Sequence, residues 1–295
     1  MLPLRVLLTG AEGQLGCELL RTTPISCEVT ACGRGELDIT DIEGVDRKVA
    51  RLRPDLIVNT AAYTAVDRAE REPDLAFQIN AEGARNVSRA AMAHGARLIH
   101  ISTDFVFDGE RGRPYQPEDI PNPLSVYGAS KRRGEEYVLD ATDGSALILR
   151  TAWLYSGLRS NFVTTMLQRM NDGQALEIVA DQVGTPTWAK GLAESIWQAA
   201  ASSRLQGLHH WTDAGVASWY DFAVAIQEEA LACGLLGRPT VIRPINTVDY
   251  PTPAKRPRFS VLDKTTTWSG LAIQPLHWRA ALRSMLIELG EAEDV

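Results

Sequence analysis

The first half of the chain alternates short apolar runs with stretches in which apolar residues recur at helical spacing. The apolar runs cover residues 5–9, 28–32, 55–59, 97–101 and 146–150. A run of this length, bounded by turn-forming residues, predicts a buried strand. Because helical stretches separate the runs, the pattern predicts strand–helix–strand units and a parallel sheet.

Three helices are expected between these strands. The first covers residues 14–22, and the second, in which Val45 and Val49 share one face, ends before Pro54. The third is a long helix over residues 74–94, which Gly95 closes in the position after the helix end.

A fourth helix carries Tyr127 and Lys131 and follows a loop with four prolines, because proline disfavours regular structure. The second half of the chain is less regular. Short strands are expected over residues 176–180 and 241–245, helices over residues 220–232 and 278–289, and a basic, proline-rich loop over residues 250–258.

Composition narrows the class of protein. The chain has 295 residues, 45% of them hydrophobic, and a formal net charge of −7, which argues against nucleic acid or an anionic membrane as a partner. We expect neither a signal peptide nor a membrane span. Four cysteines without a C-x-x-C pair favour a reduced, cytoplasmic setting, and the five histidines show no metal-ligand spacing, so we expect no metal site.

A glycine-rich turn joins the first predicted strand to the first predicted helix. Its glycines follow a G-x-x-G-x-x-G spacing, and the residues expected to contact a dinucleotide are Gly10, Gly13, Gln14, Leu15 and Gly16. Such a turn lets a pyrophosphate approach a helix N-terminus, where free N–H groups and the helix dipole favour negative charge. A purely structural turn is the alternative. With a strand before it and a helix after it, the turn predicts a Rossmann-type, doubly wound α/β fold.

The ends of the second and third strands supply further cofactor candidates. Arg34 stands where an arginine accommodates the 2′-phosphate of NADP, which favours NADPH over NADH, although a solvated charge is the alternative. Asp38 and Ile39 could contact the adenine end, or Asp38 could cap the next turn. The third strand ends in small residues and a tyrosine that would let the dinucleotide lie close to the backbone, or that simply pack there: Ala61, Ala62 and Tyr63.

The chemistry is expected around Tyr127 and Lys131. Residues four apart on a helix share a face, so the ammonium can lower the pKa of the phenol and favour proton exchange. A surface tyrosine beside a solvated lysine is the alternative. Thr103 ends the fourth strand, where open parallel sheets bind ligands, and its hydroxyl can bind a carbonyl oxygen or merely cap a loop.

Taken together, these segments resemble the extended short-chain dehydrogenase/reductases and, within them, the dTDP-4-dehydrorhamnose reductases. The most specific runs are Thr-Asp-Phe-Val-Phe-Asp-Gly at 103–109 and Pro-Thr-Pro-Ala-Lys-Arg-Pro at 251–257. Further matching runs cover residues 9–16, 58–67, 126–131 and 150–153. The resemblance implies reduction of the C4 ketone of dTDP-4-dehydro-β-L-rhamnose to dTDP-L-rhamnose with NADPH, or with NADH. It also implies residues 1–150 as the dinucleotide-binding domain and residues 151–295 mainly as a smaller substrate-binding lobe, with segments that return to the first domain.

The resemblance assigns roles to single residues. Tyr127 would donate a proton to the C4 oxygen, Thr103 would hold that oxygen, and Lys131 would bind the nicotinamide ribose while lowering the pKa of the tyrosine.

Three further positions match the substrate end of the family. Asp104 and Trp153, with Thr103, would lie near the sugar, and for Trp153 an aromatic core residue is an equal alternative. Arg256 is expected to bind the nucleotide phosphates, since guanidinium pairs with phosphate in a bidentate way.

One departure from the family concerns a metal. Some members join two subunits through magnesium held by glutamates, and Glu18 matches one such position. Lys190 stands where another acid is expected, and a charged lysine does not ligate magnesium. The resemblance allows a homodimer, but a magnesium bridge is in doubt.

Other readings stay open. Another nucleotide-sugar 4-ketoreductase would look alike, and an epimerase would share the fold. A 4,6-dehydratase needs a glutamate after Asp104, where this chain has Phe105. A non-catalytic dinucleotide-binding regulatory subunit would have no need for Thr103, Tyr127 and Lys131 together.

Overall fold

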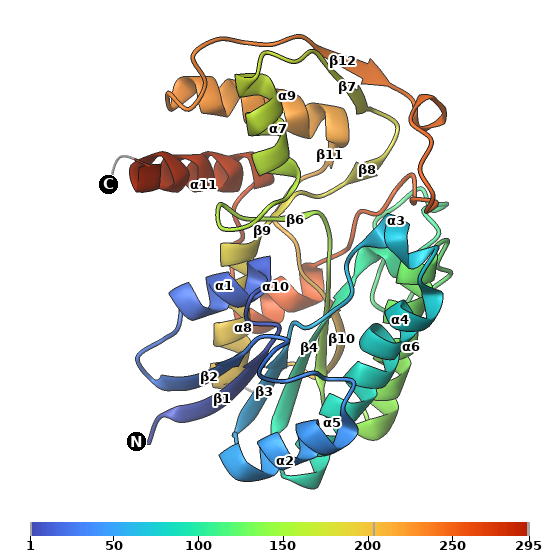
Figure 1. Ribbon diagram of the computed structural model, residues 1–295, viewed down its shortest axis with the longest axis vertical. Helices are drawn as coiled ribbons and strands as arrows, with labels where there is room; N and C mark the ends of the chain where they lie inside the picture. Colours follow the sequence, from blue (N-terminus) through green and yellow to red (C-terminus); the bar gives the residue numbers. More distant parts are fainter. Residues whose placement is uncertain (1, 203, 294–295) are drawn as a thin grey trace.

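A six-stranded parallel sheet forms the larger part of the molecule (Figure 1). The computed structural model describes residues 2–202 and 204–293. In order across the sheet the strands are β10 (Gly207–His210), β5 (Leu147–Thr151), β4 (Arg97–Thr103), β3 (Leu56–Asn59), β1 (Leu4–Thr9) and β2 (Cys27–Cys32). The chain runs from β1 outward to β2 and then returns to the other side of β1. The strand order therefore reverses direction at β1. In sheets of this kind ligands bind at the point of reversal, outside the carboxyl ends of the strands.

Helices cover both faces of the sheet because successive side chains of each strand point to opposite faces. Val6 and Leu8 of β1 pack toward α1 (Gln14–Arg21) and α8 (Ala189–Ser202), whereas Leu7 packs toward α2 (Ile42–Leu52) and α5 (Ala84–Ala93). α10 (Thr265–Leu271) joins the first face and α6 (Val126–Ala141) the second. The predicted Rossmann-type α/β fold is confirmed.

All five strands predicted in the first half of the chain are present in this sheet, which contains a sixth strand that the pattern did not predict. β10 pairs only with β5 at the edge of the sheet. Its sequence Gly-Leu-His-His carries no apolar run, because three of its four residues are only half-buried.

The predicted helix over residues 74–94 is present as one continuous run over residues 73–93, but its middle is π-helical. The segment forms α4 (Pro73–Phe77), a π-helical turn η1 (Gln78–Gly83) and then α5, while Gly95 adopts the expected left-handed conformation with φ +71°. Asn80 lies in the π turn and is buried, and its Oδ1 accepts a hydrogen bond of 2.8 Å from the N–H of Tyr63. The Nδ2 of Asn80 donates to Ser130 Oγ on α6 at 2.9 Å. Such turns are common near functional sites.

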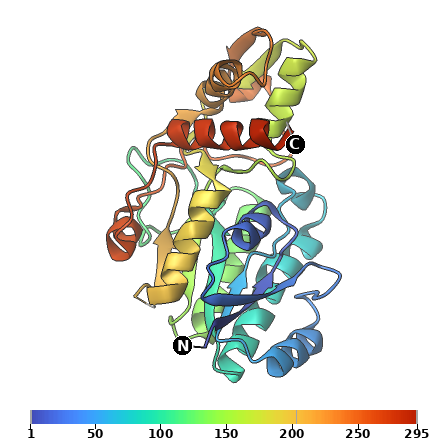
Figure 2. The same ribbon diagram turned by 90° about the vertical axis from the view of Figure 1, so that its left-hand side faces the viewer.

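A smaller lobe stacks above the carboxyl ends of the strands (Figures 1 and 2). Its helices are α7 (Phe162–Asn171), α9 (Trp219–Ala232) and α11 (Trp278–Glu293), and its core includes Phe222 and Trp278. The predicted strands and helices of this region are confirmed. Its paired strands are β7 (Leu176–Val179) with β12 (Ile242–Ile245), β8 (Val183–Gly184) with β11 (Ala217–Ser218), and β6 (Leu154–Tyr155) with β9 (Thr187–Trp188).

The two parts are linked by more than one crossing of the chain. α8, β10 and α10 come from the second half of the sequence and belong to the sheet and its cover. α11, red in Figure 2, runs along the junction and is tied to α1 by an ion pair of 2.7 Å between Glu288 and Arg21. Short helical segments are α3 (Val66–Ala69), η2 (Asp104–Val106) and η3 (Thr247–Asp249). No helix among the described residues is both long and apolar enough to cross a membrane.

Candidate active site

A cleft of about 900 Å³ lies at the carboxyl ends of the central strands and reaches into the smaller lobe. This is a volume in the usual range of small-molecule sites. Every site residue expected from the sequence lines it: Gly10, Gly13, Gln14, Leu15, Gly16, Arg34, Asp38, Ile39, Ala61, Ala62, Tyr63, Thr103, Asp104, Tyr127, Lys131, Trp153 and Arg256. Thus residues from seven separate stretches of the sequence meet in one place.

The glycine turn brings the backbone of β1 against β3 and leaves the start of α1 open. Gly10 has φ +70°, and a Cβ there would lie 2.5 Å from the amide nitrogen of Ala61, so only glycine fits. α1 begins after Gly13, and within the described residues no side chain caps it and no acid stands in its first turn. The side-chain Oε1 of Gln14 is buried and has no hydrogen-bond partner there. The free N–H groups of this helix start can donate to the pyrophosphate of a dinucleotide.

At the other end of this region Arg34 is exposed and Asp38 is fixed by its own turn. The Asp38 carboxylate accepts hydrogen bonds from the backbone N–H of Thr40 at 2.9 Å and from its hydroxyl at 2.8 Å. These bonds, with the nearby Arg34 charge, lower the pKa of Asp38. Asp38 therefore caps a turn and also faces the cleft, whereas Arg34 has its guanidinium free for an anion in the part of the chain described.

Tyr127 is brought to Thr103 by the first turn of α6. Ser125 caps the helix by accepting a hydrogen bond of 3.2 Å from the N–H of Gly128. A Cβ on Gly128 would lie 2.2 Å from the carbonyl oxygen of Phe105, so glycine lets the helix rest directly on the segment after β4. The rings of Phe105 and Tyr127 then meet edge to face at 5.5 Å.

The expectation that Lys131 lowers the pKa of Tyr127 is wrong. Burial raises the pKa of Tyr127 to about 12, and the nearby Thr103 hydroxyl opposes this only in part. Lys131 is buried, its Nζ donates to the carbonyl oxygen of Ile101 at 2.7 Å, and burial lowers its pKa to about 8. The ammonium is thus anchored to β4, and the phenol keeps its proton at neutral pH, ready to be donated.

Trp153 is held in a strained conformation on the wall of the cleft. Its φ of +46° lies in the left-handed region, where a non-glycine residue needs support from its surroundings. Its ring stacks on Trp219 with centroids 3.6 Å apart and planes 4° apart, and Gly184 leaves room for the indole on another side. Trp219 also lines the cleft and was missed from the sequence, where nothing distinguishes it from a core aromatic.

Arg256 faces the cleft but is already paired. Its Nη2 and Nη1 lie 2.8 and 3.1 Å from the two carboxylate oxygens of Asp67 on α3. This pairing lowers the pKa of Asp67. A phosphate would have to share the guanidinium with Asp67, and the phosphate-binding role of Arg256 stays a prediction.

Two buried hydroxyls were not singled out from the sequence. Ser102 on β4 and Thr151 on β5 line the cleft, and neither Oγ has a hydrogen-bond partner among the described residues. Both lie at the carboxyl ends of neighbouring strands, next to residues that were named. Their place beside or inside the matching runs was the only available signal.

The positions discussed for a metal bridge form ion pairs instead. Glu18 is buried and accepts a bond of 3.0 Å from Arg21, which also binds Glu288, and Lys190 pairs with the same Glu288. Burial raises the pKa of Glu18. Over residues 2–202 and 204–293 no cluster of three or more His, Cys, Asp or Glu side chains is arranged to hold a metal. The homodimer stays a prediction.

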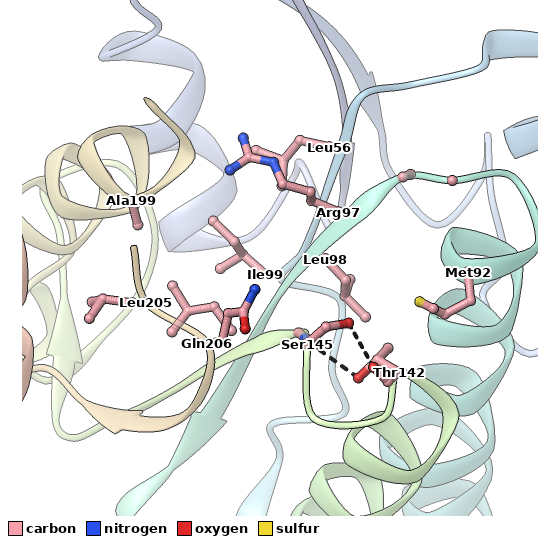
Figure 3. A pocket seen from close by; sticks show the side chains of 14 residues that line it. Leu56, Met92, Arg97, Leu98, Ile99, Thr142, Ser145, Ala199, Leu205 and Gln206 are labelled. Atoms are coloured by element: carbon pink, nitrogen blue, oxygen red, sulfur yellow. Dashed lines mark hydrogen bonds between the residues drawn. The ribbon is translucent and has the colours of Figure 1, made fainter. Parts of the chain in front are cut away.

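A second cavity of about 230 Å³ lies at the opposite end of the sheet (Figure 3). Leu98, Ile99 and Leu205 line it, and Thr142 and Ser145 hydrogen-bond each other at its edge. The side chain of Arg97 donates to the carbonyl of Ala200. None of the described residues that line this cavity is an Asp, Glu, His, Cys, Lys or Tyr.

Comparison with known proteins agrees with this geometry. A dTDP-4-dehydrorhamnose reductase of Aggregatibacter actinomycetemcomitans is 40% identical over 288 residues, which cover 95% of this chain and 98% of the relative. A probable dTDP-4,6-dihydroxy-2-methyloxan-3-one 4-ketoreductase of Streptomyces antibioticus is 41% identical over 293 residues, covering 98% and 97%. The crystal structure of dTDP-4-dehydrorhamnose reductase from Bacillus anthracis in complex with NADP superimposes with a TM-score of 0.91 at 37% identity, covering 97% of this chain and all of that one. The family model described as the RmlD substrate binding domain matches residues 4–290. With the resemblance confirmed over nearly the whole chain, the protein belongs to the RmlD substrate-binding family.

Proposed function

We propose that the protein reduces the C4 ketone of dTDP-4-dehydro-β-L-rhamnose to dTDP-L-rhamnose with NADPH. One observation carries the proposal: Thr103, Tyr127 and Lys131 meet in the same cleft as the uncapped N-terminus of α1. The names of the relatives point to the same reaction. The four cysteines are free, which supports action in the reducing cytoplasm.

Each residue of the site has its own role in the reduction of the ketone. When bound, the dihydronicotinamide supplies the hydride. Tyr127 holds a proton at neutral pH, because burial raises its pKa to about 12, and donates it to the ketone oxygen. Thr103 holds that oxygen at the end of β4. Lys131 lies one helical turn from the phenol and would bind the nicotinamide ribose.

The preference for NADPH is assigned to Arg34. Its exposed guanidinium lies on the wall of the cleft just beyond β2, where it can pair with a 2′-phosphate in a bidentate way. The Bacillus anthracis relative was solved with NADP, which supports the same choice. NADH remains a slower second cofactor in this proposal.

The test is reduction of the ketone by the purified protein. NADPH absorbance should fall on addition of dTDP-4-dehydro-L-rhamnose, and Tyr127→Phe should lower kcat by roughly 10²–10⁴-fold while NADPH still binds. Tyr137→Phe is a matched control, because Tyr137 lies on the same helix against Arg85 and Arg133, outside the cleft. No reduction by the wild-type protein would refute the proposal, and near wild-type kcat in Tyr127→Phe would remove the role of the phenol.

A second candidate is reduction of another 4-keto nucleotide sugar. The Streptomyces antibioticus relative, at 41% identity, carries the name of such a 4-ketoreductase. Because the cleft offers the same donors to any C4 ketone, a panel of 4-keto sugar nucleotides with different rings and bases separates the two candidates by kcat/KM.

A further inference from the structure

Asp104 is a buried acid that the reaction described above leaves without a chemical role. It follows β4 directly, lines the cleft and is 2% exposed. Its Oδ1 accepts a hydrogen bond of 3.1 Å from the hydroxyl of Thr103, while its buried Oδ2 has no partner among the described residues. A carboxylate can accept about four hydrogen bonds, and a buried charge with unmet acceptors is unfavourable.

The hydrogen bonds of Thr103 create a conflict with its proposed role. A hydroxyl has one proton to donate and two lone pairs to accept with. One lone pair accepts the N–H of Phe105 at 3.2 Å, and the proton points to Asp104. With Asp104 ionised, Thr103 has no proton left for a ketone oxygen.

Protonation of Asp104 removes this conflict. A neutral carboxylic acid can donate its own O–H to the second lone pair of Thr103. The Thr103 proton then turns away from Asp104 and becomes free to point into the cleft.

We propose that Asp104 works as a neutral acid that donates to Thr103 and thereby directs the Thr103 hydroxyl at the ketone oxygen. The inference rests on the reductase function proposed above. Asp104 is a positioning residue here: its proton stays on its carboxyl throughout, and the proton consumed in the reduction comes from Tyr127.

The surroundings of Asp104 favour its neutral form. Burial raises its pKa to about 6, although the hydroxyls of Ser260 and Thr103 lower it in part. Two cations of the cleft are engaged elsewhere, since Lys131 donates to a backbone carbonyl and Arg256 pairs with Asp67. Tyr127 on α6 is the titratable group that faces it, and the charge of Asp104 would raise the pKa of that phenol.

The experiment is the pH dependence of kcat/KM for ketone reduction between pH 5.5 and pH 7.5. In the wild-type protein only the neutral fraction is active, so kcat/KM should be roughly 15-fold lower at pH 7.5 than at pH 6, for a group with a pKa near 6. Asp104→Asn keeps the shape and a permanent N–H donor. Its kcat/KM profile should be flat between pH 6 and pH 7.5.

Two further variants sharpen the result. Ser260→Ala removes a hydroxyl that lowers the pKa of Asp104, so the fall in activity should move to higher pH. Asp108→Asn is the matched control, because Asp108 binds Tyr115 and Asn122 outside the cleft and should leave the profile in place.

Three outcomes would overturn the inference. Loss of activity in folded Asp104→Asn at every pH would show that the ionised acid, or proton transfer by it, is needed. If kcat/KM of the wild type does not fall between pH 6 and pH 7.5, protonation of Asp104 is irrelevant to the reaction. If kcat/KM of Ser260→Ala falls at the same pH as in the wild type, the fall belongs to another titrating group. If the wild type reduces no 4-keto sugar, the reductase function itself fails. In that case infrared spectroscopy still shows whether Asp104 is protonated. A protonated-carboxyl band that titrates near pH 6 should be present in the wild type and absent from Asp104→Asn.

Discussion

The buried ion pair between Glu135 and Arg150 fixes the helix that carries the proton donor. Arg150 on β5 donates to both carboxylate oxygens of Glu135 on α6, at 2.8 and 2.7 Å, and the side chains are 1% and 3% exposed. Glu135 follows Lys131 by one helical turn, and its charge raises the pKa of that lysine against the larger effect of burial. A change at Glu135 should therefore affect both stability and the cofactor end of the site.

Glu135→Gln leaves the Arg150 guanidinium buried without a countercharge. The remaining neighbours are poor replacements: the carbonyl of Pro117 and the ring of His210 both lie 3.4 Å away, and burial keeps that histidine neutral by lowering its pKa to about 3. Breaking one partner of a buried pair costs roughly 3–5 kcal/mol of the free energy of unfolding, which corresponds to a fall in Tm on the order of 10 °C for a chain of this size.

The assay is urea unfolding followed by circular dichroism, with two comparisons. Glu136→Gln, the next residue on the same helix, breaks exposed pairs with Arg132 and Arg133 and should cost less than about 1 kcal/mol. The double replacement Glu135→Leu with Arg150→Met removes both charges and should recover most of the loss. Equal effects of Glu135→Gln and Glu136→Gln, or no recovery in the double variant, would refute the reasoning.

The same variant has a consequence for pH dependence. Without Glu135 the pKa of Lys131 falls further below its ordinary value, so the ammonium is lost at lower pH. Binding of NADPH to Glu135→Gln should accordingly weaken at lower pH than binding to the wild type, as titration by nicotinamide fluorescence would show. An unchanged pH profile would mean that Lys131 does not contribute its charge to the cofactor.

Two more substitutions test the ends of the cleft. Gly184→Ala would place a Cβ 2.6 Å from the Trp153 indole, so the ring must move; we expect KM for the sugar nucleotide to rise about tenfold with NADPH affinity unchanged, whereas Gly237→Ala, with open space around it, should change neither. Arg34→Ala should raise KM for NADPH much more than KM for NADH in steady-state assays, and equal effects would show that Arg34 does not read the 2′-phosphate.

The elements that the sequence predicted are those whose signal is local. β1 alternates between the two faces of the sheet and is followed at once by the glycine turn, so a few consecutive residues predict strand, turn and helix. The same holds for Tyr127 and Lys131, which a single helix places on one side. Each of these features depends on residues within about two turns of one another.

The features that were missed depend on distant partners. Trp219 meets Trp153 only through the fold of the smaller lobe, and Arg256 finds Asp67 across most of the chain. The edge strand β10 has no apolar pattern because only β5 pairs with it. None of these contacts produces a regular spacing of apolar residues that could be recognised in the sequence.

The position of the proton donor shows how both kinds of information combine. The spacing of Tyr127 and Lys131 predicts a shared helix face, yet the place of that face in the cleft is set by contacts along the rest of α6. Gly128 rests on Phe105, and Gly134 approaches the π turn so closely that a Cβ would lie 2.2 Å from the carbonyl of Asn80. The pair of Glu135 with Arg150 then fixes the helix to the sheet. A four-residue spacing thus becomes a site only because glycines and one buried ion pair hold α6 against β4 and β5.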